Sequence, residues 1–154
     1  MRGDIYSPFA ARAKEYSWRL CTRMAPRNIT PMDVDFALDC RDKFALFEMK
    51  TEGALMPYGQ KLFYEKLLRA LGFNRAILMV VEHPPLDRIE LPTDVTSVQL
   101  HMLSRKGDVH EYAKVFGSES FSLLYGGFFK WAEGDSGALA DAYYRCTRGA
   151  AHTA

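Results

Sequence analysis

Two pairs of charged residues stand at the two ends of the stretch from Asp33 to Lys50, in which most of the other residues are apolar. Asp33 and Asp35 open one alternating apolar stretch, and Glu48 and Lys50 end the next. Side chains two positions apart on a strand share a face and lie roughly 6.6–6.8 Å apart along it. If the two stretches pair as a hairpin, three carboxylates and one ammonium meet at one end of a sheet.

These residue types suit metal-assisted hydrolysis of a phosphodiester. Crowded carboxylates in a partly dry site need a cation or hydrogen bonds to compensate their charge. Mg²⁺ is commonly held by one or two carboxylates, with water and substrate phosphate as the other ligands. Lys50 can orient an attacking hydroxide or stabilise the phosphoryl transition state. The alternative is that Asp33 and Asp35 lie on a solvated face while Lys50 pairs with Glu48 or Glu52.

Hydrophobic periodicity predicts the elements that position these residues. Ser7-Pro8 is a typical helix start, and the apolar spacing continues to Met24. Alternation predicts strands over 33–39 and 43–50 with a turn between them. An amphipathic helix is predicted over "GQKLFYEKLLRALG", which ends at Gly72, and the buried strand "RAILMVVEHPP" that follows completes a crossover unit.

The second half of the chain carries weaker signals. The sequence "SRKGD" separates two apolar stretches, which predicts a hairpin of strands over 97–103 and 109–116. A helix is expected over "SESFSLLYGGFFKWAEGD" despite its two glycines. A short last helix is expected over Ala138–Cys146, and "TRGAAHTA" is expected to be a frayed tail.

The motifs resemble those of the PD-(D/E)XK nuclease superfamily, in particular the domains of Holliday junction resolvases and RecB-like nucleases. Its motif strand carries (D/E)-x-K, here Glu48-Met49-Lys50, and a metal-binding aspartate lies on the preceding strand, here Asp35. RecB-like members carry Q-x-x-x-Y on the next helix, which Gln60 and Tyr64 match. The nearest proline to the "PD" position is Pro31, so both Asp33 and Asp35 are candidates for the principal ligand.

The resemblance implies an α/β fold with a restriction-endonuclease-like core of a helix, a mixed central sheet and a crossover helix. This core would cover about residues 7–84 of a single domain 1–154, and a C-terminal β-hairpin and helices would follow over about 93–147.

The implied activity is that of a Mg²⁺-dependent deoxyribonuclease in which Mn²⁺ can substitute. Asp35 and Glu48, with Asp33, would hold the metal, and Lys50 would stabilise charge at the reacting phosphate. Some relatives use a glutamate of the first helix, for which Glu15 is the candidate. Gln60 and Tyr64 would position the substrate.

DNA is the expected partner, and several basic residues are candidates for contacting its backbone. They are Arg12, Arg19, Arg23, Arg27, Arg105 and Lys106. A homodimer would suit an enzyme that cuts both strands of a duplex, but the sequence does not show one.

Composition sets the wider limits. The 154 residues carry a net charge of +1 and are 48% hydrophobic and 25% charged, as in an ordinary globular protein. The three cysteines form no C-x-x-C pair, which favours a reducing compartment. The chain lacks a secretory leader and an apolar run of membrane-spanning length, so a cytoplasmic protein with no membrane partner is expected.

Two other functions compete with the nuclease interpretation. A catalytically silent module could keep the fold and bind nucleic acid or a protein partner. A hydrolase that uses serine or cysteine with histidine has little support, because none of the four histidines has a nucleophile motif nearby. Their spacing also suits no zinc site.

Overall fold

The computed structural model describes residues 19–24, 26 and 32–153. It divides into two compact units, Met1–Asp33 and Val34–Ala154. In the first unit, helix α2 covers Arg19–Met24. The earlier part of the helix predicted from Ser7 lies outside the described residues.

The second unit is built on a mixed sheet of six strands, which confirms the α/β class. The strands are β1 (Phe36–Cys40), β2 (Lys43–Thr51), β3 (Ala76–His83), β4 (Ser97–Leu103), β5 (Val109–Glu111) and β6 (Val115–Phe116). Their order is β1-β2-β3-β4-β5, with β6 beside β4. Only the β2–β3 pair is parallel among the described strands, as expected for two strands joined by a crossover helix.

Strands β1 and β2 form the predicted hairpin. Cys40 pairs with Lys43 across a two-residue turn in which Arg41 has a φ of 58°. The first strand was expected from residue 33 but begins at Phe36. Immediately before it, the Asp35 carboxylate accepts a hydrogen bond from the Met49 backbone N–H at 2.7 Å, so a side chain satisfies a donor that a longer β1 could have bound.

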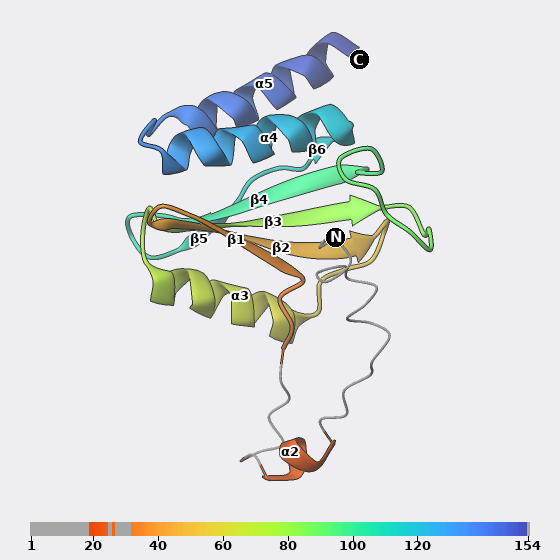
Figure 1. The fold of residues 1–154 in the computed structure, drawn as a ribbon, viewed down its shortest axis with the longest axis vertical. Helices are drawn as coiled ribbons and strands as arrows, with labels where there is room; N and C mark the ends of the chain where they lie inside the picture. Colours follow the sequence, from red (N-terminus) through yellow and green to blue (C-terminus); the bar gives the residue numbers. More distant parts are fainter. Residues whose placement is uncertain (1–18, 25, 27–31, 154) are drawn as a thin grey trace, which may run out of the picture. The chain divides into compact units, whose positions relative to one another are not determined.

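Helices cover both faces of the sheet (Figure 1). Helix α3 (Tyr58–Leu71) lies on one face, and helices α4 (Gly117–Ala132) and α5 (Ala138–Thr153) form a layer on the other. The alternation of a central strand explains these two cores, because successive side chains point to opposite faces. Leu46 packs with Tyr64 and Leu68 on the α3 side, whereas Phe47 belongs to the core that contains Phe128.

The glycine pair of α4 is tolerated because one member lies at a close helix contact. A Cβ on Gly127 would come within 2.8 Å of the Ala142 Cβ on α5, whereas a Cβ on Gly126 would meet nothing within 4 Å. Gly127 therefore lets α4 and α5 approach each other closely.

Two further predicted boundaries are wrong. The strand expected over 109–116 is divided into β5 and β6, because the register against β4 advances by one residue between them. The last helix continues past Cys146 to Thr153, so the segment expected to fray is largely helical. Arg148, Ala150 and Ala151, which are good helix formers, lie in this extension. No helix in the described part of the chain has both the length and the apolar character needed to cross a membrane.

Candidate active site

Five of the predicted residues come together at the carboxyl end of β2, and we call this group the carboxylate site. Its members are Asp35, Glu48, Lys50, Gln60 and Tyr64. Phe36 pairs with Phe47 across the hairpin, so one further step of the antiparallel register brings Asp35 opposite Glu48.

Glu48 is the centre of the carboxylate site. It is only 4% exposed, and its Oε1 accepts a 2.6 Å hydrogen bond from Tyr64 Oη. Its other oxygen, Oε2, lies 3.5 Å from Lys50 Nζ. Lys50 Nζ also donates a 2.8 Å hydrogen bond to Gln60 Oε1. The buried carboxylate therefore has a hydroxyl and an ammonium as partners.

Helix α3 supplies Tyr64, the partner of Glu48, and Gln60, the partner of Lys50, because it runs antiparallel to β2. Its first turn lies beside the end of β2, which places Gln60 next to Lys50. Tyr64 is one turn further along and therefore reaches Glu48, which lies two residues earlier on the strand. The distance between Gln60 and Tyr64 along the helix thus matches the distance between Lys50 and Glu48 along the strand, so both pairs meet across the helix–sheet interface.

Opposing effects act on the protonation of Glu48. Burial is the largest, and it raises the pKa of the Glu48 carboxyl above its ordinary value of 4.5. The hydrogen bond from Tyr64 opposes this increase, and the negative charge of Asp35 reinforces it. Lys50 and Gln60 also favour the charged form, but the net pKa remains raised. A cation bound between the two carboxylates would lower it.

The metal-binding capacity of the carboxylate site rests on Asp35 and Glu48. Within the described residues, no three His, Cys, Asp or Glu side chains are grouped so as to hold a metal ion. Two carboxylates are nevertheless enough for Mg²⁺, which usually keeps several water ligands. The repulsion between Asp35 and Glu48 is the feature of the structure that such an ion would relieve.

Most of the other predicted residues belong to the first unit or lie outside the described residues. Asp33 is exposed and belongs to the first unit, as do the exposed Arg19 and Arg23 of α2. Glu15, Arg12 and Arg27 lie outside the described residues.

Arg105 and Lys106, the DNA contacts predicted in the turn after β4, are distant from the carboxylate site along the sheet. Arg105 and Lys106 follow the end of β4, which pairs with the start of β3, whereas the carboxylate site adjoins the other end of these strands. The Arg105 guanidinium lies 4.9 Å from the centre of the Phe73 ring.

Two charged residues beside Lys50 were missed from the sequence. Glu82 pairs with Lys50 in the parallel register of β2 and β3, and Lys114 Nζ lies 2.9 Å from Glu82 Oε1. An acid at the end of the otherwise apolar run "AILMVVEH" was the available signal for Glu82. The sequence carries no such signal for Lys114, because its approach to Glu82 depends on the packing of distant strands.

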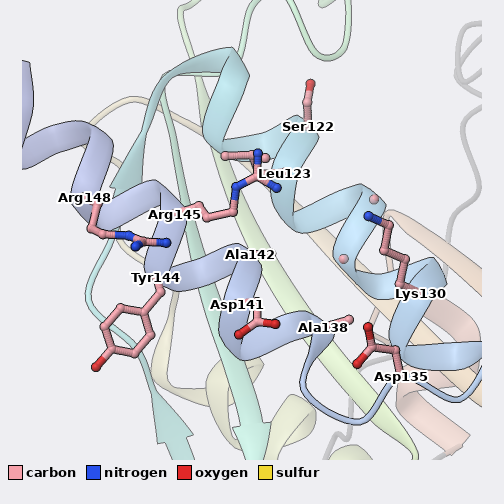
Figure 2. A pocket seen from close by; sticks show the side chains of 12 residues that line it. Ser122, Leu123, Lys130, Asp135, Ala138, Asp141, Ala142, Tyr144, Arg145 and Arg148 are labelled. Atoms are coloured by element: carbon pink, nitrogen blue, oxygen red, sulfur yellow. The ribbon is translucent and has the colours of Figure 1, made fainter.

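A hollow of about 510 Å³ opens on the outer side of helices α4 and α5 (Figure 2). Arg145 and Arg148 of α5 and Lys130 of α4 line it, together with Asp135 and Asp141. These helices cover the face of the sheet opposite to α3 (Figure 1). The hollow is therefore separate from the carboxylate site, and its charges are mixed.

Comparison of the chain with protein-family models, with curated proteins and with solved structures finds no match. The function is therefore inferred from the geometry of the carboxylate site.

Proposed function

We propose that this protein is a metal-dependent nuclease that hydrolyses phosphodiester bonds of DNA on a restriction-endonuclease-like core. The observation that supports this most directly is the convergence of Asp35, Glu48 and Lys50 at one strand end. A buried Glu48 beside a second carboxylate is unfavourable without a cation, and Lys50 supplies one fixed positive charge there.

Asp35 and Glu48 would hold Mg²⁺ or Mn²⁺, which supplies Lewis-acid activation of water and neutralises charge on the phosphate. Lys50 would orient the attacking water or stabilise the negative charge that develops on the phosphoryl oxygens. Gln60 fixes the Lys50 ammonium by accepting its hydrogen bond, and Tyr64 keeps Glu48 oriented by donating one. Gln60 and Tyr64 thus act as positioning residues.

Cleavage of a labelled DNA panel tests the proposal. Linear duplex, single-stranded, flapped and four-way-junction DNA would be incubated with the purified chain and Mg²⁺ or Mn²⁺, with EDTA as the metal-free control. Lys50→Ala should lower the cleavage rate by about 10²- to 10³-fold. Lys66→Ala, which removes an exposed lysine of the same α3 helix, is the matched control and should cleave normally.

The outcome separates the nuclease from a non-cleaving module. Metal-dependent cleavage that Lys50→Ala abolishes supports the nuclease, and the panel then identifies the preferred DNA structure. Tight binding of DNA without cleavage of any member, under either metal, would instead support a nuclease fold that only binds.

A further inference from the structure

A polar strip continues from the carboxylate site across the next strands of the sheet. Glu82 lies four residues after Leu78, so both side chains are on the face of the sheet that α3 covers. Helix α3 begins at Tyr58 beside Lys50 and runs toward the other end of β2, so Glu82 lies where the helix cover stops. The polar groups around Glu82 therefore adjoin Lys50 directly.

The Glu82 carboxylate connects three segments of the chain. Its Oε1 accepts hydrogen bonds from Ser97 Oγ of β4 and from Lys114 Nζ, and its Oε2 lies 3.4 Å from the Gly53 backbone N–H after β2. The Ser97 hydrogen bond is the largest effect that lowers the pKa of Glu82, and Lys114 contributes to the same shift. Glu82 is therefore an anion at neutral pH and holds Lys114 in a defined position.

Lys114 reaches Glu82 because the chain bulges between β5 and β6. The one-residue change of register against β4 falls in this segment, and bulges redirect side chains near functional sites. Backbone hydrogen bonds from Tyr112 N to Leu100 O and from Gly117 N to Thr96 O fix the chain on both sides of Lys114. The backbone on both sides of Lys114 is thus held by the sheet.

The exposure of the two partners shows which of them meets the solvent. The Lys114 side chain is 46% exposed, whereas that of Glu82 is 12% exposed. A lysine ammonium has three N–H donors, and within the described residues Glu82 is the one acceptor for Lys114. An anion that approaches from solvent therefore meets the ammonium before it meets Glu82.

An ion pair with a half-exposed lysine contributes little to stability. If Lys114 were absent, the Glu82 carboxylate would still accept the hydrogen bond from Ser97 Oγ. The Lys114 ammonium is therefore a positive charge at the end of the sheet that contributes little to stability.

We propose that Lys114 binds a backbone phosphate of the nucleic-acid substrate, next to the phosphate held at Lys50, so that the strand crosses the sheet from β2 toward β4. This inference rests on the proposed nuclease function, and it assigns the substrate path over Glu82. Glu82 acts as the positioning residue that holds Lys114, and Lys50 remains the residue at the reacting phosphate.

The salt dependence of DNA binding, measured without cleavage, tests this path. Labelled single-stranded and duplex oligonucleotides would be titrated in EDTA at several salt concentrations with wild type, Lys114→Gln, Lys114→Arg and Lys130→Ala. Each lost phosphate contact reduces the slope of log K against log salt by about 0.7 for a single strand and about 0.9 for a duplex. Lys114→Gln should show this reduction, because glutamine can still donate to Glu82 but carries no charge.

The other variants serve as controls. Lys114→Arg keeps the charge and should keep the wild-type slope. Lys130→Ala removes an exposed lysine of α4, on the opposite face of the sheet, and should leave the slope unchanged. A Lys114→Gln variant that is folded by circular dichroism and has the wild-type slope would overturn the proposal, as would a wild-type protein that binds neither oligonucleotide. A reduced slope in a protein that cuts no DNA supports the phosphate contact while the nuclease function fails, so the two failures are distinguishable.

Discussion

Tyr64 Oη donates a 2.6 Å hydrogen bond to Glu48 Oε1 from the opposite side of the helix–sheet interface. Both residues are almost completely buried, at 1% and 4% exposure. A fixed hydroxyl in a dry interface selects one orientation of the carboxylate, which leaves Oε2 directed toward Lys50. The contact therefore fixes how the Glu48 carboxylate faces Lys50.

Tyr64→Phe should lower the free energy of unfolding by about 1.5–3 kcal/mol at neutral pH, the usual range for a hydrogen bond to a charged group. The substitution keeps the buried ring and removes the donor to Glu48. Urea denaturation measures the change. Equal stability of variant and wild type would mean that Glu48 does not depend on this hydroxyl.

Glu48→Gln should become more stable relative to wild type as the pH rises. The folded-state pKa of Glu48 is raised above 4.5, so the wild-type folded state keeps a proton that the unfolded chain has released. The contribution of Glu48 is therefore greatest below pH 4.5 and is lost as the pH rises through the raised pKa. Denaturation of both proteins in EDTA across this range measures the difference.

Glu82→Gln is the matched comparison, and it should show the opposite trend. The pKa of Glu82 is lowered, chiefly by Ser97, so its contribution is present above pH 4.5 and is lost as the pH falls through the folded-state value. Glu82→Gln should thus be less stable than wild type at neutral pH and approach it in acid. If the stability of both variants changed in the same direction with pH, this would contradict the buried environment of Glu48 or the hydrogen-bonded environment of Glu82.

Gln60→Ala should reduce metal-dependent cleavage by about 10- to 100-fold, the usual effect of removing a residue that orients a site group. Gln60 accepts a hydrogen bond from Lys50 Nζ, and without it the ammonium can rotate toward Glu48 Oε2, 3.5 Å away. Steady-state kinetics on the preferred DNA measure this, with Lys66→Ala as the control on the same helix. A change in KM alone would indicate that Gln60 binds substrate and does not position Lys50.

Gly127→Ala should lower the free energy of unfolding by about 1–3 kcal/mol, because its Cβ would come within 2.8 Å of the Ala142 Cβ. Gly126→Ala is the matched control in the same helix. Its Cβ would meet nothing within 4 Å, so helix propensity should make it more stable by about 0.5–1 kcal/mol. Thermal and urea denaturation compare the pair, and equal effects would contradict the close packing of α4 on α5.

Local patterns in the sequence were sufficient for the elements that carry the carboxylate site. The alternation in β2, the helical spacing of α3 and the apolar run of β3 each depend on neighbouring residues, and all three elements appear where they were predicted. The E-x-K and Q-x-x-x-Y spacings indicated the right residues for the same reason, since each motif lies within one element. Asp35 could be included because a short turn fixes the register of its hairpin.

Only the tertiary structure decided the features that depend on distant segments. The register of β4 against β3 separates Arg105 and Lys106 from the carboxylate site, and the bulge between β5 and β6 brings Lys114 to Glu82. The burial of Glu48, which raises its pKa, results from α3 packing over the sheet. Sequence periodicity shows which face of an element is apolar, but strand pairing and helix packing determine which charged groups meet across that face.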